Sequence, residues 1–316
     1  MRRFAQLLPL LLSALPGTAL AQTYPSKPIN LVIGFPQGGP NDILGRLAAG
    51  WLSERLGQRV VPDNKPGNSG NIATEAVVRA APDGYTLLLV GPANAISGSN
   101  PNLPFVFLRD IELIGGITRE ALVLVVHPSV KAQNAKELIA LARSPDAKLR
   151  MASTGVGSSP HLSGELFKTM TGIAMPVIHY GGGGPALKAM IAGEAEVMFE
   201  PMSASIEPVR TGKLRALAVS TSARSTALPD LPVLADTVPG YEASAVTGLG
   251  APRGTPPDVV AKLNAAMNAA FTDAAMRRKL ADTGGEPLPG TPVDFAEVMK
   301  SETEKWGKVA KSTLGK

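Results

Sequence analysis

The residues best placed to bind a ligand are glycines, asparagines and serines in short loops that directly follow apolar runs. The first such loop, residues 35–42, follows the β-branched run 31–33 and precedes an amphipathic segment. This arrangement predicts the end of a strand followed by the start of a helix. The first N–H groups of a helix have no partner within it, and the helix dipole makes that end positive. The loop is therefore a candidate site for a carboxylate or phosphate, with an ordinary strand-to-helix turn as the alternative.

The same arrangement recurs along the chain. Glycine- and asparagine-rich loops follow apolar runs at 64–71 and 91–95, and glycine- and serine-rich loops follow them at 153–159 and 180–184. In an open parallel sheet, the loops at the carboxyl ends of the strands form the ligand-binding edge. The spacing therefore predicts two α/β units, each with binding loops at one edge of its sheet.

Groups suited to catalysis are missing from these loops. The sequence has no Gly-x-Ser-x-Gly elbow, no phosphate-binding Gly-Lys-Ser/Thr and no Gly-x-Gly-x-x-Gly. It has no cysteine, and its three histidines lie far apart without metal-ligand spacing. Ser158 and Ser159 near His161 suggest a Ser–His pair, but a helix cap explains them better, and we interpret the histidines as structural. The Asp and Glu residues are interpreted as lying on helix faces, so we predict no catalytic residue, metal or cofactor.

The N-terminus has the features of a secretory signal peptide. Arg2 and Arg3 precede an apolar core at 7–15, and small residues before Gln22 form a cleavage site after Ala21. No later apolar run reaches 18 residues, so the mature chain is expected to be periplasmic and not embedded in a membrane. The net charge of +5 and the aromatic content of 4% are too low to indicate a nucleic-acid partner.

The periodicity of apolar residues predicts the following elements. Helices are expected at 42–56, with Asn41 as N-cap, and at 72–80, 135–142, 160–171, 185–192, 257–271, 274–281 and from 292. Strands are expected at 31–33, 60–62, 85–90, 121–127, 149–153, 177–180, 195–199, 214–220 and 243–251. The helix-rich C-terminal segment is expected to pack back onto the first unit. The chain would then cross twice between a first lobe (22–123 with 246–316) and a second lobe (124–245), after the signal peptide at 1–21.

A series of short motifs from Tyr24 to Trp306 resembles one family over the whole mature chain. The motifs include Tyr24-Pro25-Ser26-Lys27-Pro28, Phe35-Pro36 with Gly38-Gly39 and Asp42, Ala81-Pro82-Asp83-Gly84-Tyr85, Ser153-Thr154-Gly155 with Gly157-Ser158, Tyr180 with Gly182-Gly183, and Gly212-Lys213-Leu214-Arg215. No single motif is specific, but together they resemble the substrate-binding receptors of tripartite tricarboxylate transporters, the Bug receptors.

The resemblance implies an α/β fold of the type II periplasmic binding protein class, in which two lobes joined by two crossing strands close on one ligand. It implies a monomeric receptor that binds a small organic carboxylate through backbone amides and delivers it to transporter membrane subunits. A ligand-responsive sensor partner and an exported α/β hydrolase remain alternatives. The candidate ligand-binding residues are Phe35, Gln37, Gly38, Gly39, Asn41, Asp42, Asn94, Ser153, Thr154, Gly157, Ser158, Tyr180, Gly181 and Gly182.

Several positions depart from the family pattern, since Pro40 and Asn41 replace the more usual Gly and Ser/Thr and Val156 stands where Asn is common. Two further departures bear on the charge and size of the ligand. Gly181 stands where the family usually has Lys or Arg, and Val246 where it commonly has Trp. If position 181 faces the cleft, both changes favour a ligand with one carboxylate and a bulkier, less charged body. If position 181 faces solvent, its change is neutral.

Overall fold

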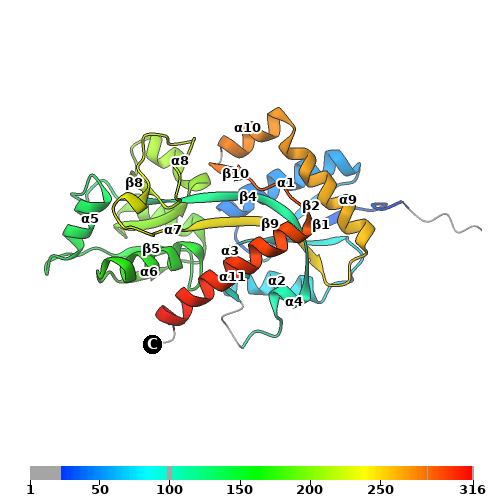
Figure 1. Cartoon of the computed structure of the whole chain (residues 1–316), viewed down its shortest axis with the longest axis horizontal. Coiled ribbons are helices and arrows are strands. Elements are labelled where there is room, and N and C mark those ends of the chain that lie inside the picture. The colour runs from blue at the N-terminus through cyan, green and yellow to red at the C-terminus, as the bar shows by residue number, and fades with distance from the viewer. Residues whose placement is uncertain (1–22, 98–101, 283, 315–316) are drawn as a thin grey trace, which may run out of the picture.

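A computed structural model describes residues 23–97, 102–282 and 284–314, so the predicted signal peptide lies outside the described residues. Figure 1 shows two α/β lobes side by side, joined by the long strands β4 (Ile111–Val126) and β9 (Ser244–Pro252). The sheet order is β2-β1-β3-β9-β4-β7-β5-β6, and β8 and β10 also pair with β4. The two-lobed fold with two crossing strands is confirmed.

The first lobe is built on three parallel strands, β2 (Val60–Asn64), β1 (Ile29–Ile33) and β3 (Thr86–Val90). Alternate residues of β1 enter different cores, as the period of a strand requires. Ile29, Leu31 and Ile33 pack with α1 (Pro40–Leu56) and α9 (Pro257–Asn268), whereas Val32 packs with α2 (Asn71–Val78). Apolar residues on both faces explain why these strands read as continuous hydrophobic runs.

The second lobe repeats this plan. Its parallel strands are β7 (Val197–Pro201), β5 (Met151–Ser153) and β6 (Val177–His179), with β8 (Arg215–Val219) antiparallel to β4. The helices are α5 (Ala135–Ala142), α6 (Ser159–Thr171), α7 (Gly183–Ala192) and α8 (Met202–Arg210). The sequence prediction missed α8, because Pro208 lies inside it.

The crossing strand β4 is longer than predicted. The sequence indicated a strand only from residue 121, whereas β4 begins at Ile111 and pairs with β9 across nearly its whole first half. Glycines and polar residues at 115–120 interrupt its apolar pattern, and the pairing register shifts twice near them. Tertiary pairing therefore outweighed a weak local strand signal.

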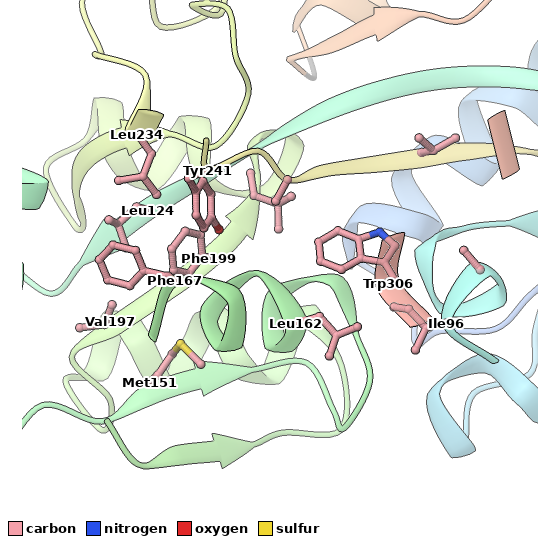
Figure 2. Packing of buried hydrophobic residues seen from close by; sticks show 14 of the residues in the cluster. Ile96, Leu124, Met151, Leu162, Phe167, Val197, Phe199, Leu234, Tyr241 and Trp306 are labelled. Atoms are coloured by element: carbon pink, nitrogen blue, oxygen red, sulfur yellow. The ribbon is translucent and has the colours of Figure 1, made fainter. Parts of the chain in front are cut away.

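The C-terminal segment contains α9, α10 (Ala274–Asp282), β10 (Gly285–Pro287) and α11 (Pro292–Leu314). As predicted, α9 and α10 pack on the first lobe. The last helix differs from the prediction, because α11 contacts α3 (Pro92–Ser97) of the first lobe and also α6 of the second. Its Trp306 is fully buried in the same cluster as Ile96 and Leu162, which come from the two different lobes (Figure 2).

The remaining elements are short. They are the helices α3 (Pro92–Ser97) and α4 (Phe107–Asp110) and the 3₁₀ turns η1 (Asn68–Gly70), η2 (Leu234–Asp236) and η3 (Ala269–Phe271).

Candidate functional site

A cavity lies between the lobes where helix N-termini from both lobes converge. It encloses about 580 Å³ of space not filled by atoms, part of it open to solvent. The first lobe contributes the starts of α1 and α3, the second lobe contributes the starts of α6, α7 and α8, and β4 and β9 contribute Glu120, Ala245 and Thr247. Several helix dipoles therefore point their positive ends at one small volume.

The first-lobe loop, residues 35–42, leads into α1 earlier than predicted. The helix begins at Pro40 with Gly39 as N-cap, so the prediction of Asn41 as the N-cap is wrong. Proline is well suited to the first helical position because it has no N–H to leave unpaired. Asn41 instead lies in the first turn and lines the cavity.

Asp42 supports this loop from behind. Its carboxylate accepts hydrogen bonds from Gly38 N (2.9 Å), Arg46 Nε (2.9 Å) and Asn64 Nδ2 (3.0 Å). Burial opposes ionisation of Asp42, but the hydrogen bonds from Arg46, Gly38 and Asn64 outweigh it and lower the pKa. Asp42 is therefore ionised, and its hydrogen bonds hold the loop in place. It does not line the cavity.

The second-lobe loop, residues 153–159, is supported by neutral side chains. Ser153 Oγ lies 2.7 Å from His179 Nδ1, and the N–H of Gly157 donates to His161 Nδ1 at 3.0 Å. Ser158 caps α6 by accepting a hydrogen bond from the backbone N–H of His161. Ser158 and His161 therefore do not form a Ser–His pair. The Ser158 hydroxyl accepts from the backbone N–H of His161, and the ring nitrogen Nδ1 of His161 accepts from the backbone N–H of Gly157.

The two histidines pack edge to face with ring centroids 4.8 Å apart. Burial, followed by the neighbouring His179, lowers the pKa of His161 to about 4, and burial also lowers the pKa of His179. Both rings are therefore neutral at pH 7, which agrees with the structural role predicted for His161 and His179.

The structure divides the predicted ligand-binding residues into two groups. Those that line the cavity are Phe35, Gly39, Asn41, Thr154 and Ser158. Those outside its lining are the supporting residues Asp42, Ser153 and Gly157, the α3 residue Asn94, the exposed Gln37, Gly38 and Gly181, and Tyr180 and Gly182.

Contacts across the cleft bring the lobes close together. Ser69 donates a hydrogen bond through its hydroxyl to the carbonyl of Val156 at 2.8 Å. A Cβ on Gly182 would lie 3.0 Å from Pro36, and one on Gly183 would lie 2.9 Å from Pro40. The lobes are thus in mutual contact, and glycine at these positions permits it.

Sequence reasoning missed the acidic residues of the cavity. Glu120 on β4 lines it, and Glu200, at the end of β7, lies directly behind Gly183. The two are 1% and 0% exposed, so the interpretation that acidic residues lie on helix faces is wrong for them. A usable signal existed for Glu200, a single acid directly after the apolar run 197–199, where an unpaired charge is rarely placed. Glu120 follows the polar residues Thr118 and Arg119, so no such signal marked it.

The departures at Gly181 and Val246 both lie outside the lining of the cavity. Val246 is 1% exposed and packs in the core, while its neighbours Ala245 and Thr247 line the cavity, so the expectation that valine at 246 leaves room for a bulkier ligand is wrong. Gly181 is exposed, and a Cβ there would meet nothing within 4 Å. Neither position therefore shapes the cavity described above.

No helix of the described residues is both long and apolar enough to cross a membrane. Within the described ranges, no group of three or more His, Cys, Asp or Glu residues is arranged to hold a metal ion.

Comparison with known proteins identifies the family. Residues 44–314 match the model of the tripartite tricarboxylate transporter family receptor. Protein BugT of Bordetella pertussis is 35% identical over 300 residues, which cover 94% of this chain and 92% of BugT.

Solved structures agree with this match. R. palustris Rpa4515 with adipate is 35% identical with a TM-score of 0.88, and the match covers 91% of this chain and 97% of that one. MatC from Rhodopseudomonas palustris with bound malate is 30% identical with a TM-score of 0.84, covering 90% and 99%. The chain described here belongs to the tripartite tricarboxylate transporter receptor family.

Proposed function

We propose that this protein is an extracytoplasmic solute receptor that binds a small organic carboxylate between its lobes and delivers it to a tripartite membrane transporter. The observation that carries the proposal is the convergence of helix N-termini from both lobes on one cavity. Helix N-termini are suited to a carboxylate because they present free backbone N–H groups and a positive dipole end. The adipate and malate bound to related receptors support the same ligand class.

The expected affinity follows from these contacts. Hydrogen bonds to a charged group contribute about 1.5–3 kcal/mol each, and each helix N-terminus adds about 0.3–1 kcal/mol. Three or four such bonds, set against the cost of association, correspond to a Kd of about 1 μM. Contacts such as that of Ser69 with Val156 would form as the lobes close on the ligand, which is the common behaviour of hinged two-lobed receptors.

Location and partners complete the proposal. The mature protein would begin at Gln22 in the periplasm as a monomer, with lobes at 22–123 plus 246–316 and at 124–245. N-terminal sequencing of exported protein tests the cleavage site, since material that retains Met1 would contradict it. Mass spectrometry of the small molecule that co-purifies with the protein is the most direct test of the ligand.

The substitution Gly39→Val tests where the carboxylate binds. Gly39 has φ −88°, which valine tolerates, and a Cβ there lies 3.7 Å from Pro36 O and 3.9 Å from Gly184 N. The valine methyl groups would block the approach to the amides between α1 and α7. We expect calorimetry with the co-purified ligand to show at least a tenfold loss of affinity and little change in the free energy of unfolding.

The matched control is Gly50→Val in the same helix, where a Cβ meets nothing within 4 Å. This variant should bind as the wild type does. Wild-type affinity in Gly39→Val would place the carboxylate elsewhere.

A further inference from the structure

Two buried carboxyl groups at the cavity have few or no hydrogen-bond partners. Among the described residues, Glu120 Oε1 and both carboxylate oxygens of Glu200 have none. The other oxygen of Glu120 accepts only a long bond from Ser203, at 3.4 Å. Because buried polar groups are normally satisfied, three unpartnered carboxyl oxygens beside one cavity require an explanation.

Both carboxyl groups lie at the cavity between the lobes. Glu120 lines the cavity, and Glu200 Oε1 lies 3.5 Å from where a Cβ on Gly183, another lining residue, would be. Burial raises the pKa of Glu120 to about 8. Burial, then Glu120, raises the pKa of Glu200 well above its usual range.

The surrounding charges do not compensate this pair. Of the described residues that line the cavity, Glu120 is the only one with a charged side chain. The adjacent Arg119 turns away, donating to Ser244 and Glu302 instead. On the first-lobe side, Arg46 is already paired with the Asp42 carboxylate. The cavity therefore has an electropositive side at the helix N-termini and a side with two uncompensated acids at the strands.

We propose that Glu120 and Glu200 form a subsite for a positively charged nitrogen, so that the ligand is an amino-carboxylate. Its carboxylate would face the helix N-termini and its ammonium group the two glutamates. The inference rests on the proposed function and narrows its substrate class. An ammonium donates up to three hydrogen bonds to these carboxyl oxygens and favours their ionised form, whereas a second ligand carboxylate would be desolvated beside the two acids without a countercharge.

A metal ion is a poorer occupant. Two carboxylates are present here, and the described residues contain no group of three acidic, His or Cys ligands. An organic cation covalently linked to the bound carboxylate needs no further protein ligands, so the ammonium of the ligand itself is favoured.

The experiment uses matched ligands that differ only at one end. Calorimetry at pH 8 compares γ-aminobutyrate, succinate and butyrate, and then ε-aminocaproate, adipate and caproate, on the wild-type protein. We expect the amino-carboxylate of the better-fitting length to bind at least tenfold more tightly than the dicarboxylate of that length. We also expect its affinity to rise from pH 6 to pH 8, because an ionised glutamate is needed to hold the ammonium.

The variants Glu120→Gln and Glu200→Gln, singly and together, remove the charge at nearly constant volume. The double variant should lose at least tenfold in affinity for the amino-carboxylate and less than twofold for the monocarboxylate. The control is Glu112→Gln, on the same strand β4, whose carboxylate pairs with Arg253 at 3.1 Å and does not line the cavity. Because the glutamine variants remove buried acids, they should unfold at the same temperature as the wild type or higher, so loss of binding cannot be attributed to misfolding.

The outcomes separate the two claims. Tightest binding of a dicarboxylate or a monocarboxylate, or an unchanged preference in the double variant, would overturn the ammonium subsite and leave the carboxylate receptor in place. If none of the six ligands binds, both the carboxylate receptor and the subsite are contradicted.

Discussion

The loops at 35–42 and 153–159 perform the same task with different supporting chemistry. Each loop ends at a helix N-terminus that lines the cavity. The first is held by an ionised carboxylate, Asp42, and the second by neutral histidine rings, His161 and His179. The comparison teaches that a side chain in a binding loop can act on the loop backbone, which in turn binds the ligand.

Because the supporting groups differ, the two loops lose their stabilising interactions over different pH ranges. The lowered pKa of Asp42 means that its contribution to stability is present at neutral pH and is lost only as the pH falls below its ordinary value of 3.8. His161 must remain neutral in the fold, so its contribution is lost earlier, as the pH falls from 6.5 toward 4. Mild acid should therefore loosen the second-lobe loop before the first.

The largest expected effect comes from removing the ionised support of the first loop. Asp42→Ala deletes a buried acceptor of three hydrogen bonds, including those from Gly38 and Asn64. Such bonds contribute about 1.5–3 kcal/mol each but are not additive, so we expect unfolding to become easier by about 4 kcal/mol in urea titrations. Asp63→Ala, which breaks a half-exposed pair with Lys65, is the control and should cost less than about 1 kcal/mol. Equal losses in the free energy of unfolding of the two variants would show that Asp42 does not stabilise the loop more than an ordinary surface carboxylate.

A slightly smaller effect should follow acidification of the second loop. A native pKa of about 4 against an ordinary 6.5 corresponds to a loss of about 3 kcal/mol of stability between pH 6.5 and pH 4. The variant His161→Gln lacks this titration, so its stability should fall less over that range. The control His127→Gln alters a half-buried residue that contacts Ser129 and should follow the wild-type profile. Identical slopes for wild type and His161→Gln would show that the neutral ring is not required.

The smallest effect concerns the contact that joins the two lobes. Ser69→Ala removes the hydroxyl that donates to the Val156 carbonyl, and a neutral hydrogen bond contributes about 1 kcal/mol, so ligand affinity should fall about fivefold by calorimetry. Ser69 has φ 51°, which glycine adopts without strain.

Ser69→Gly is therefore the matched variant, with the same affinity loss but higher stability than Ser69→Ala. X-ray scattering with and without ligand should show a smaller radius of gyration in the bound state. Equal affinity in both variants and wild type would mean that the contact does not select the closed state.

The order of most strands, binding loops and helices was determined by the sequence alone, whereas α8, the first half of β4 and the short elements α3, α4 and β10 were not. Glycine and proline mark the ends of strands and the starts of helices because they act on backbone dihedral angles, which are local. The loops 35–42 and 153–159 were identified in this way, as were the boundaries of α5. The spacing of these elements also predicted two α/β units and two crossings between them, and the family motifs added the type II periplasmic binding protein class.

Tertiary structure alone decided which side chains meet in the cavity. The helix α1 begins two residues earlier than predicted, and in this register Asn41 lines the cavity whereas the Asp42 carboxylate bonds the loop backbone at Gly38. Glu120 and Glu200, which are distant in sequence, come together because β4 lies between β9 and β7. Burial and electrostatic coupling depend on such non-local pairing, so local sequence patterns do not reveal them.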